Sequence, residues 1–159
     1  HFDGKIRLPV KDMDRREKEI RGAVYHEYVH ALLQENLPDC PSWLHEGLAQ
    51  AVECGRVLGR DAEEARTAPL KNLKEEAWIP LAALDKPIAS LGDAGRIRLA
   101  YAESLSFVRY LEGRFGASAM QVFLSRWKER PARPYREPFK DAYGSSLEEL
   151  EKDWRDARR

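Results

Sequence analysis

Residues 21–55 read RGAVYHEYVHALLQENLPDCPSWLHEGLAQAVECG and contain parts of two predicted helices. Apolar side chains recur at helical spacing from about Asp14 to Asn36, which predicts the first helix over that range. The second helix begins at Ser42, the expected N-cap, and Gly55 is the expected C′ residue. Residues 37–41 form a short loop, and a short loop makes consecutive helices antiparallel neighbours.

The first of these helices carries His26-Glu27-Tyr28-Val29-His30, an HExxH motif. Four residues advance an α-helix by about 400°, so the two imidazoles lie about 40° apart around the axis and both can reach one ion. Glu27 lies about 60° from His30, beside that ion, where its carboxylate can take a proton from a water molecule. The pattern is typical of a zinc site in which Glu27 is the general base.

A third ligand is expected on the second helix, because a catalytic zinc site has three protein ligands and leaves the fourth position to water. Fifteen residues separate His30 from Glu46, and two histidines with one glutamate are a known catalytic ligand set. Glu46 lies between Leu44 and Leu48, a setting in which a free carboxylate is costly. We therefore expect Glu46 to bind the metal, and Gly47 to allow close contact between helices.

The rest of the chain is predicted to be mostly helical. Residues 55–93 have weak periodicity, which predicts loops with short helices, whereas helical spacing returns over 94–114 and 117–130. A short helix then leads to Gly144, and Ser146-Leu147-Glu148-Glu149 predicts a capping box that opens a last helix. At the start, Gly4 to Val10 alternates apolar and polar residues, which predicts a strand, and Pro9 marks it as an edge strand.

The composition describes one domain of balanced charge. The chain has 159 residues, with 27 Lys and Arg against 27 Asp and Glu. Zero net charge gives no excess positive charge to attract nucleic acid or anionic lipid, and no apolar run approaches the roughly 20 residues of a membrane span.

The chain starts abruptly in a predicted strand, so we expect it to be cut from a longer protein. Cys40 and Cys54 are expected to be free thiols, because the intervening helix holds them about 15 Å apart.

HExxH followed by Trp43-Leu44-x-Glu46-Gly47-Leu48-Ala49 resembles the gluzincin branch of the zinc metallopeptidases, specifically the bacterial peptidase-MA-like domains. Later parts of the chain also resemble landmarks of such domains, so the likeness covers nearly the whole chain: residues 101–104 with Phe107, Tyr110 and Leu111, then residues 114–116, and residues 142–150 before Trp154. The family implies an α+β, predominantly helical, zincin-like domain, with a zinc-site part over 1–55 and a helical C-terminal part over 56–159. It also implies that the edge strand binds an extended peptide substrate by strand addition, through Lys5, Ile6, Arg7 and Leu8.

The resemblance also assigns roles around the metal. Gluzincins commonly use a Tyr or His from outside the zinc helices to donate to the oxyanion, which makes Tyr101 the candidate, with a core aromatic as the alternative. Gln50 stands where thermolysin-like relatives often have an acid that accepts the imidazole N–H, and Glu53 is its competitor for that role.

Two further side chains lie next to the predicted site. Tyr28, inside the motif, is expected to pack against other side chains. His45 is expected at the cleft rim or in solvent, because it points about 100° away from Glu46.

Together these patterns predict a zinc-dependent metallopeptidase domain that acts on a peptide or protein substrate. His26, His30 and Glu46 hold Zn²⁺, and Glu27 acts as general base and then as proton donor to the leaving amine. Two alternatives remain open. One is a zinc-binding module with weak or no turnover that acts in protein–protein interaction or regulation. The other is a helical interaction domain whose histidines are surface residues or satisfied core residues.

Overall fold

The computed structural model describes residues 16–130 and 132–158, and every regular element in this part of the chain is helical. The α-helices are α1 (Glu17–Asn36), α2 (Ser42–Glu53), α3 (Arg60–Thr67), α4 (Ala94–Phe115), α5 (Ala117–Glu129), α6 (Arg136–Tyr143) and α7 (Leu147–Asp156). Between α2 and α4 the chain forms a π-helical turn, η2 (Cys54–Leu58), and the 3-10 helices η3 (Ala68–Leu70), η4 (Glu75–Ala77), η5 (Leu81–Asp85) and η6 (Ile88–Leu91). The predominantly helical class is thus confirmed. The predicted edge strand, with Lys5, Ile6, Arg7 and Leu8, lies outside the described residues.

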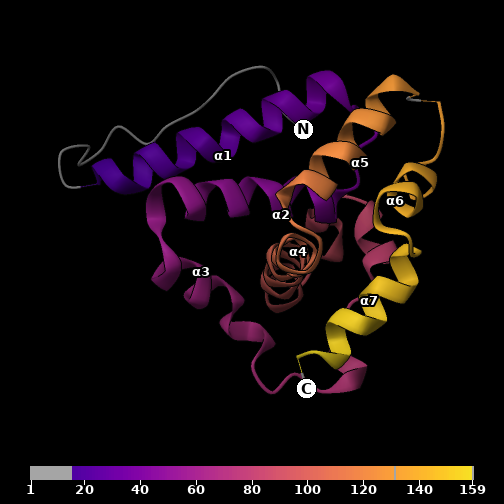
Figure 1. The fold of residues 1–159 in the computed structure, drawn as a ribbon. Coiled ribbons are helices and arrows are strands. Elements are labelled where there is room, and N and C mark those ends of the chain that lie inside the picture. Colours follow the sequence, from indigo (N-terminus) through magenta and orange to yellow (C-terminus); the bar gives the residue numbers. More distant parts are fainter. Residues whose placement is uncertain (1–15, 131, 159) are drawn as a thin grey trace.

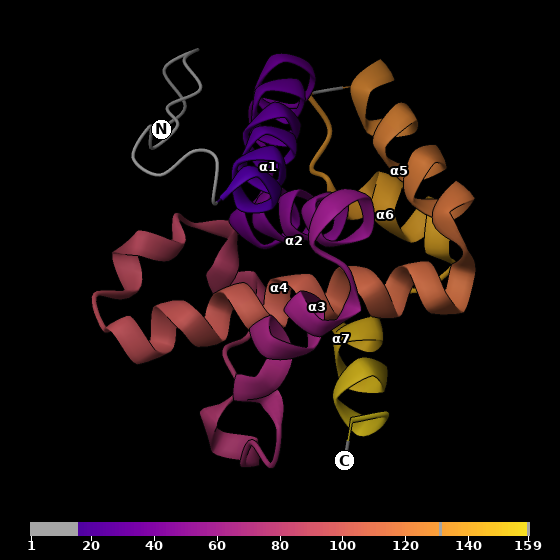
Figure 2. The same ribbon diagram turned by 90° about the vertical axis from the view of Figure 1, so that its left-hand side faces the viewer.

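The central element is α4. Figure 1 looks almost along its axis, with the other helices around it, and Figure 2 shows it crossing the molecule between α2 above and α7 below. The side chains of Leu105, Phe107, Val108 and Leu111 are all fully buried, because neighbouring helices cover α4 on more than one side. The helix therefore forms the middle of the hydrophobic core and supports the elements that carry the predicted site.

The second helix, α2, lies between α1 and α4. At Gly47 the backbones of α2 and α4 approach so closely that a Cβ atom would lie 2.5 Å from the carbonyl oxygen of Ser104 and 2.6 Å from Val108 Cγ2. The predicted close contact at Gly47 therefore exists, and its partner is α4. Because glycine has no Cβ, it lets α2 sit directly on the central helix.

The ends of α2 differ from the sequence prediction. The N-cap is Pro41 and Ser42 is already inside the helix, with no side-chain cap. At the other end, η2 follows α2 directly and includes Gly55, and the turn comes at Gly59, whose φ of 86° favours glycine. The amide of Gly59 closes the turn on Cys54 O at 2.8 Å. This later turn leads into α3, which brings Arg66 to the side of α2.

The C-terminal helices complete the core with aromatic side chains. Trp43, from the start of α2, lies 5.3 Å from Phe107 between ring centroids, and Phe107 lies 5.4 Å from Trp154 of α7. Helix α7 begins with the predicted capping box between Ser146 and Glu149. Among the described helices, none combines the length and the apolar composition needed to cross a bilayer.

One face of α1 is turned away from α2. Gly22 and Leu33 are buried on the inner face, whereas Tyr28 is 53% exposed, so the prediction that Tyr28 packs is wrong. The reason is geometric: Tyr28 lies about 160° around the helix axis from His30 and cannot share its face. The histidines and the outer aromatic side chains of α1 therefore point in different directions.

Candidate metal centre

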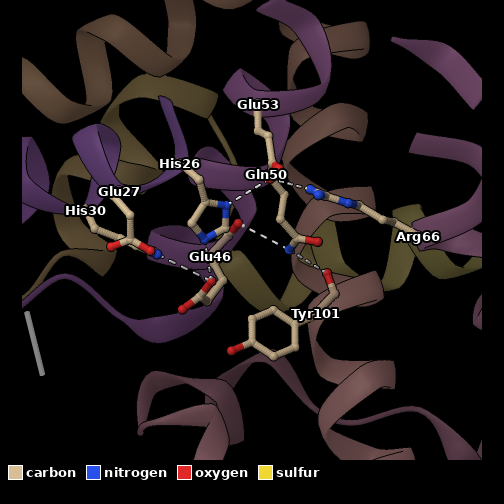
Figure 3. Close-up of a pocket in the computed structure, with 8 residues that line it drawn as sticks. All are labelled: His26, Glu27, His30, Glu46, Gln50, Glu53, Arg66 and Tyr101. Carbon is tan, nitrogen blue, oxygen red and sulfur yellow. Dashed lines mark hydrogen bonds and ion pairs between the residues drawn. The ribbon is translucent and has the colours of Figure 1, made fainter. Parts of the chain in front are cut away.

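Three side chains from two helices converge on one point. His26 and His30 come from α1 and Glu46 comes from α2, and Figure 3 shows them pointing toward one another. Glu46 Oε2 lies 3.6 Å from Nε2 of His26 and 3.6 Å from Nε2 of His30. All three candidate ligand atoms lie within 4.8 Å of one another, and within residues 16–130 and 132–158 this is the one such group.

The donor set and its spacing fit zinc. Tetrahedral zinc with bonds of about 2.0–2.1 Å places neighbouring ligand atoms roughly 3.3 Å apart, close to the 3.6 Å separations from Glu46 Oε2. Two imidazole nitrogens and one carboxylate oxygen are also ligands that zinc prefers. The described residues supply three such ligands at this point, so a fourth coordination position would be available for water or substrate.

The three candidate ligands lie at the wall of a pocket of about 420 Å³. Its lining combines all the predicted site residues of the described helices with one basic side chain: His26, Glu27, His30, Glu46, Gln50, Glu53, Arg66 and Tyr101. Glu27 extends on the same side as the ligands in Figure 3, with its carboxylate near the point of convergence. The predicted base and the predicted ligands therefore share one cavity.

On the far side of its ring, His26 meets a carboxylate. Its Nδ1 lies 3.1 Å from Glu53 Oε2, and the same oxygen accepts a hydrogen bond from Arg66 Nη1 at 2.6 Å. Gly22, one turn before His26, makes room for this contact, because a Cβ there would lie 3.1 Å from Glu53 Oε1. Of the two residues proposed for this position, it is Glu53, and not Gln50, that contacts the ring.

The charge of Glu53 follows from its partners. Burial alone would raise the pKa of its carboxyl, but the hydrogen bonds from His26 and Arg66 lower that pKa to about 2. An ionised Glu53 accepts a hydrogen bond from His26 Nδ1–H, which leaves His26 Nε2 directed at the candidate metal position.

Gln50 connects α2 to α4. Its Nε2 donates to Glu46 O at 3.2 Å and to Tyr101 O at 3.0 Å, so its amide binds backbone oxygens and no imidazole. Tyr101 lines the pocket, and burial, together with the nearby charge of Glu46, raises the pKa of its hydroxyl. Tyr101 therefore keeps its proton near neutral pH and can donate a hydrogen bond.

The two predicted histidine ligands have different electrostatic surroundings. Burial lowers the pKa of His26, but the carboxylates of Glu46 and Glu53 more than offset this and raise it to about 9. Burial lowers the pKa of His30, and Glu46 alone opposes this. The difference arises because His26 has a carboxylate at each ring nitrogen. Metal binding would therefore have to displace a proton from His26.

His45 lies against His30, although the sequence placed it at the rim or in solvent. Its Nδ1 is 2.6 Å from His30 Nδ1, and the two rings are nearly parallel, with centroids 4.6 Å apart and an interplanar angle of 21°. Burial and the neighbouring His30 lower the pKa of His45 to about 4. Helical geometry turns His45 about 100° away from Glu46, as expected, but in this direction its side chain meets α1 and not solvent.

Arg66 lines the pocket, and the sequence did not single it out. It lies on α3, within the charged and weakly periodic segment 55–93, and its contact with Glu53 depends on the turn at Gly59. No motif spacing pointed to it. The one signal for Arg66 was the general expectation that a buried acid such as Glu53 has a basic partner.

Comparison with known proteins gives a match at the level of a family. A family model described as the peptidase MA superfamily matches residues 17–158. This range begins at the first residue of α1 and extends beyond α7, so it includes the candidate metal centre and the helices packed around α4. Searches of curated proteins and of solved structures gave no match.

Proposed function

Because the chain belongs to the peptidase MA superfamily, we propose that it is a zinc-dependent metallopeptidase domain of the gluzincin type. The observation that carries the proposal is the convergence of His26, His30 and Glu46 at the wall of a pocket that also contains Glu27. Structural zinc sites are usually closed by four protein ligands, whereas catalytic sites use three. Three candidate ligands beside a cavity therefore favour a catalytic site.

In the proposed reaction a peptide bond is hydrolysed. A zinc ion held by the three ligands would supply Lewis-acid activation of water and of the substrate carbonyl. Glu27 takes a proton from the attacking water as the water oxygen bonds to the carbonyl carbon of the substrate. It then delivers that proton to the nitrogen of the leaving amine as the C–N bond breaks. The Tyr101 hydroxyl donates a hydrogen bond to the carbonyl oxygen as negative charge develops there. The proposed substrate is accordingly a peptide or protein.

The substitution Glu27→Gln tests the proposal. Gln keeps the size of the side chain but cannot take a proton, and Glu27 contacts none of the candidate ligands through a hydrogen bond or ion pair that would be lost. We expect the variant to retain zinc at the level of the unsubstituted protein and to lose peptide hydrolysis by about 10²- to 10⁴-fold. Zinc content measured by elemental analysis and digestion of a broad peptide library check the two parts.

A second variant separates metal binding from catalysis. Glu46→Gln removes the candidate carboxylate ligand, so zinc and hydrolysis are expected to fall together. Undiminished hydrolysis by Glu27→Gln would refute the role of the base. An unsubstituted protein that holds zinc and cleaves no peptide would instead support a non-catalytic zinc-binding module.

A further inference from the structure

We propose that His45 is a positioning residue for His30: it accepts a hydrogen bond from His30 Nδ1–H and so holds His30 in the tautomer whose Nε2 is free to bind the metal. The inference rests on the proposed function, because it takes His30 to be a metal ligand. Its starting observation is the 2.6 Å separation between the two Nδ1 atoms.

The contact and the direction of His30 together determine where the protons lie. Two ring nitrogens at 2.6 Å form a hydrogen bond only if one of them donates and the other accepts. His30 Nε2 lies 3.6 Å from Glu46 Oε2, on the side where the candidate ligands converge. A neutral imidazole that binds metal through Nε2 carries its proton on Nδ1. His30 is therefore the donor, His45 Nδ1 is the acceptor, and His45 carries its own proton on Nε2.

A neutral acceptor suits the charge of this pocket. The lining already includes three carboxylates, those of Glu27, Glu46 and Glu53, against one guanidinium, that of Arg66. A carboxylate at the position of His45 would add a fourth negative group beside the candidate ligands. The imidazole of His45 supplies the hydrogen-bond acceptor without that charge, so His26 and His30 are oriented by groups of different kinds.

The position of His45 is fixed by its own helix. Its backbone amide donates to Pro41 O at 3.0 Å in the first turn of α2, and its ring lies nearly parallel to that of His30. His45 and Glu46 are consecutive residues, so α2 provides both a candidate metal ligand and the group that orients a ligand on α1. The ring of His45 therefore couples the orientation of His30 to the position of α2.

Two substitutions at this position separate the hydrogen bond from simple packing. His45→Asn retains a short side chain with an acceptor oxygen, whereas His45→Leu fills similar space and has no acceptor. We expect His45→Leu to weaken zinc binding by about 10- to 100-fold, as measured by competition with a chelator, and His45→Asn to restore most of the loss. Thermal unfolding of the zinc-free proteins shows whether each variant is folded.

The second measurement is spectroscopic. In the zinc-loaded protein, long-range ¹H–¹⁵N correlation spectra report which nitrogen of His30 carries the proton. We expect the Nδ1–H signal of His30 to be shifted downfield by its hydrogen bond in the unsubstituted protein and in His45→Asn, and to lose this downfield shift in His45→Leu. Equal zinc affinity in all three proteins, or equal weakening in both variants, would overturn the proposed role of His45 alone. A protein that binds no zinc before any substitution would overturn the proposed function as well.

Discussion

Glu53 is the residue through which the candidate metal centre contacts α3. One of its oxygens, Oε2, accepts from both His26 Nδ1 at 3.1 Å and Arg66 Nη1 at 2.6 Å. A carboxylate in this position orients a ligating imidazole and increases its basicity. Arg66 also donates to the Glu53 carboxylate, and this contact raises the pKa of the Arg66 guanidinium. The three side chains act as one hydrogen-bonded chain.

Glu53→Ala is predicted to lower zinc affinity by about 10- to 100-fold, because the N–H of His26 and the guanidinium of Arg66 both lose their acceptor. Chelator competition measures the change. Gln50→Ala is the control, since Gln50 lies on the same helix and in the same pocket but donates only to the backbone oxygens of Glu46 and Tyr101. Equal losses in the two variants would contradict a specific role for Glu53.

At this scale the sequence could indicate the candidate ligands but not all of their partners. His26 and His30 share a face because of helical spacing, and Glu46 follows on the next helix after a short loop. These relations are local. The contacts of His45 and Arg66 depend on how α2 is rotated about its axis and on where η2 ends, and both are set by tertiary packing.

The packing of α2 on α4 depends on one residue without a side chain. A Cβ at Gly47 would lie 2.5 Å from a backbone oxygen of α4, that of Ser104, which cannot move without moving the central helix. Gly47 is also adjacent to Glu46, so its contact sets the depth at which the candidate ligand sits. Close helix packing and metal geometry are therefore determined by the same turn of α2.

Gly47→Ala is predicted to destabilise the fold by about 1–3 kcal/mol, because the added methyl group forces α2 away from α4. The matched control is Gly113→Ala on α4, where a Cβ meets no atom within 4 Å and the position is exposed. That change is expected to stabilise the protein by about 0.4–1 kcal/mol through the helix-forming tendency of alanine. Urea denaturation of the two variants checks both signs, and a neutral or stabilising effect at Gly47 would refute the close approach.

The helix boundaries show which element-level features the sequence determines. Helix α4 was predicted over 94–114 and spans Ala94–Phe115, and the capping box of α7 was predicted at Ser146 and is present. The end of α2 was not predictable in the same way. Arg109 of α4 donates to Ala51 O at 2.9 Å near the end of α2, and the chain turns only at Gly59, whose amide donates to Cys54 O at 2.8 Å, so the contacts at this end include one from a distant part of the chain.

For the whole molecule, the helical pattern of the sequence was sufficient to predict a predominantly helical fold, as the described residues show. What the pattern left open was the arrangement of residues 55–93, whose short helices wrap around α4 and have no strong periodicity of their own. Ile79, in this segment, is only 1% exposed and donates its amide to Glu103 Oε1 of α4 at 3.0 Å. A buried carboxyl group on the central helix thus fixes the connecting segment to the core.

Glu103 makes the stability of the molecule depend on pH. Its side chain is fully buried, its Oε2 has no hydrogen-bond partner among the described residues, and burial raises its pKa from 4.5 to about 8. Between these two values the unfolded chain loses the proton and the folded chain keeps it. The free energy of unfolding should therefore fall as pH rises through this range, by up to about 1.4 kcal/mol per pH unit from this group, and level off above about pH 8.

Glu103→Gln isolates this contribution. Gln keeps the oxygen that accepts from Ile79 and does not ionise, so the variant should lack the part of the pH dependence that belongs to Glu103, while every other titrating group is shared with the unsubstituted protein. Urea denaturation between pH 5 and pH 8 should show the variant gaining stability relative to the unsubstituted protein as pH rises. Parallel stability curves would mean that the carboxyl group of Glu103 titrates alike in the folded and unfolded chains, contrary to its burial in the core.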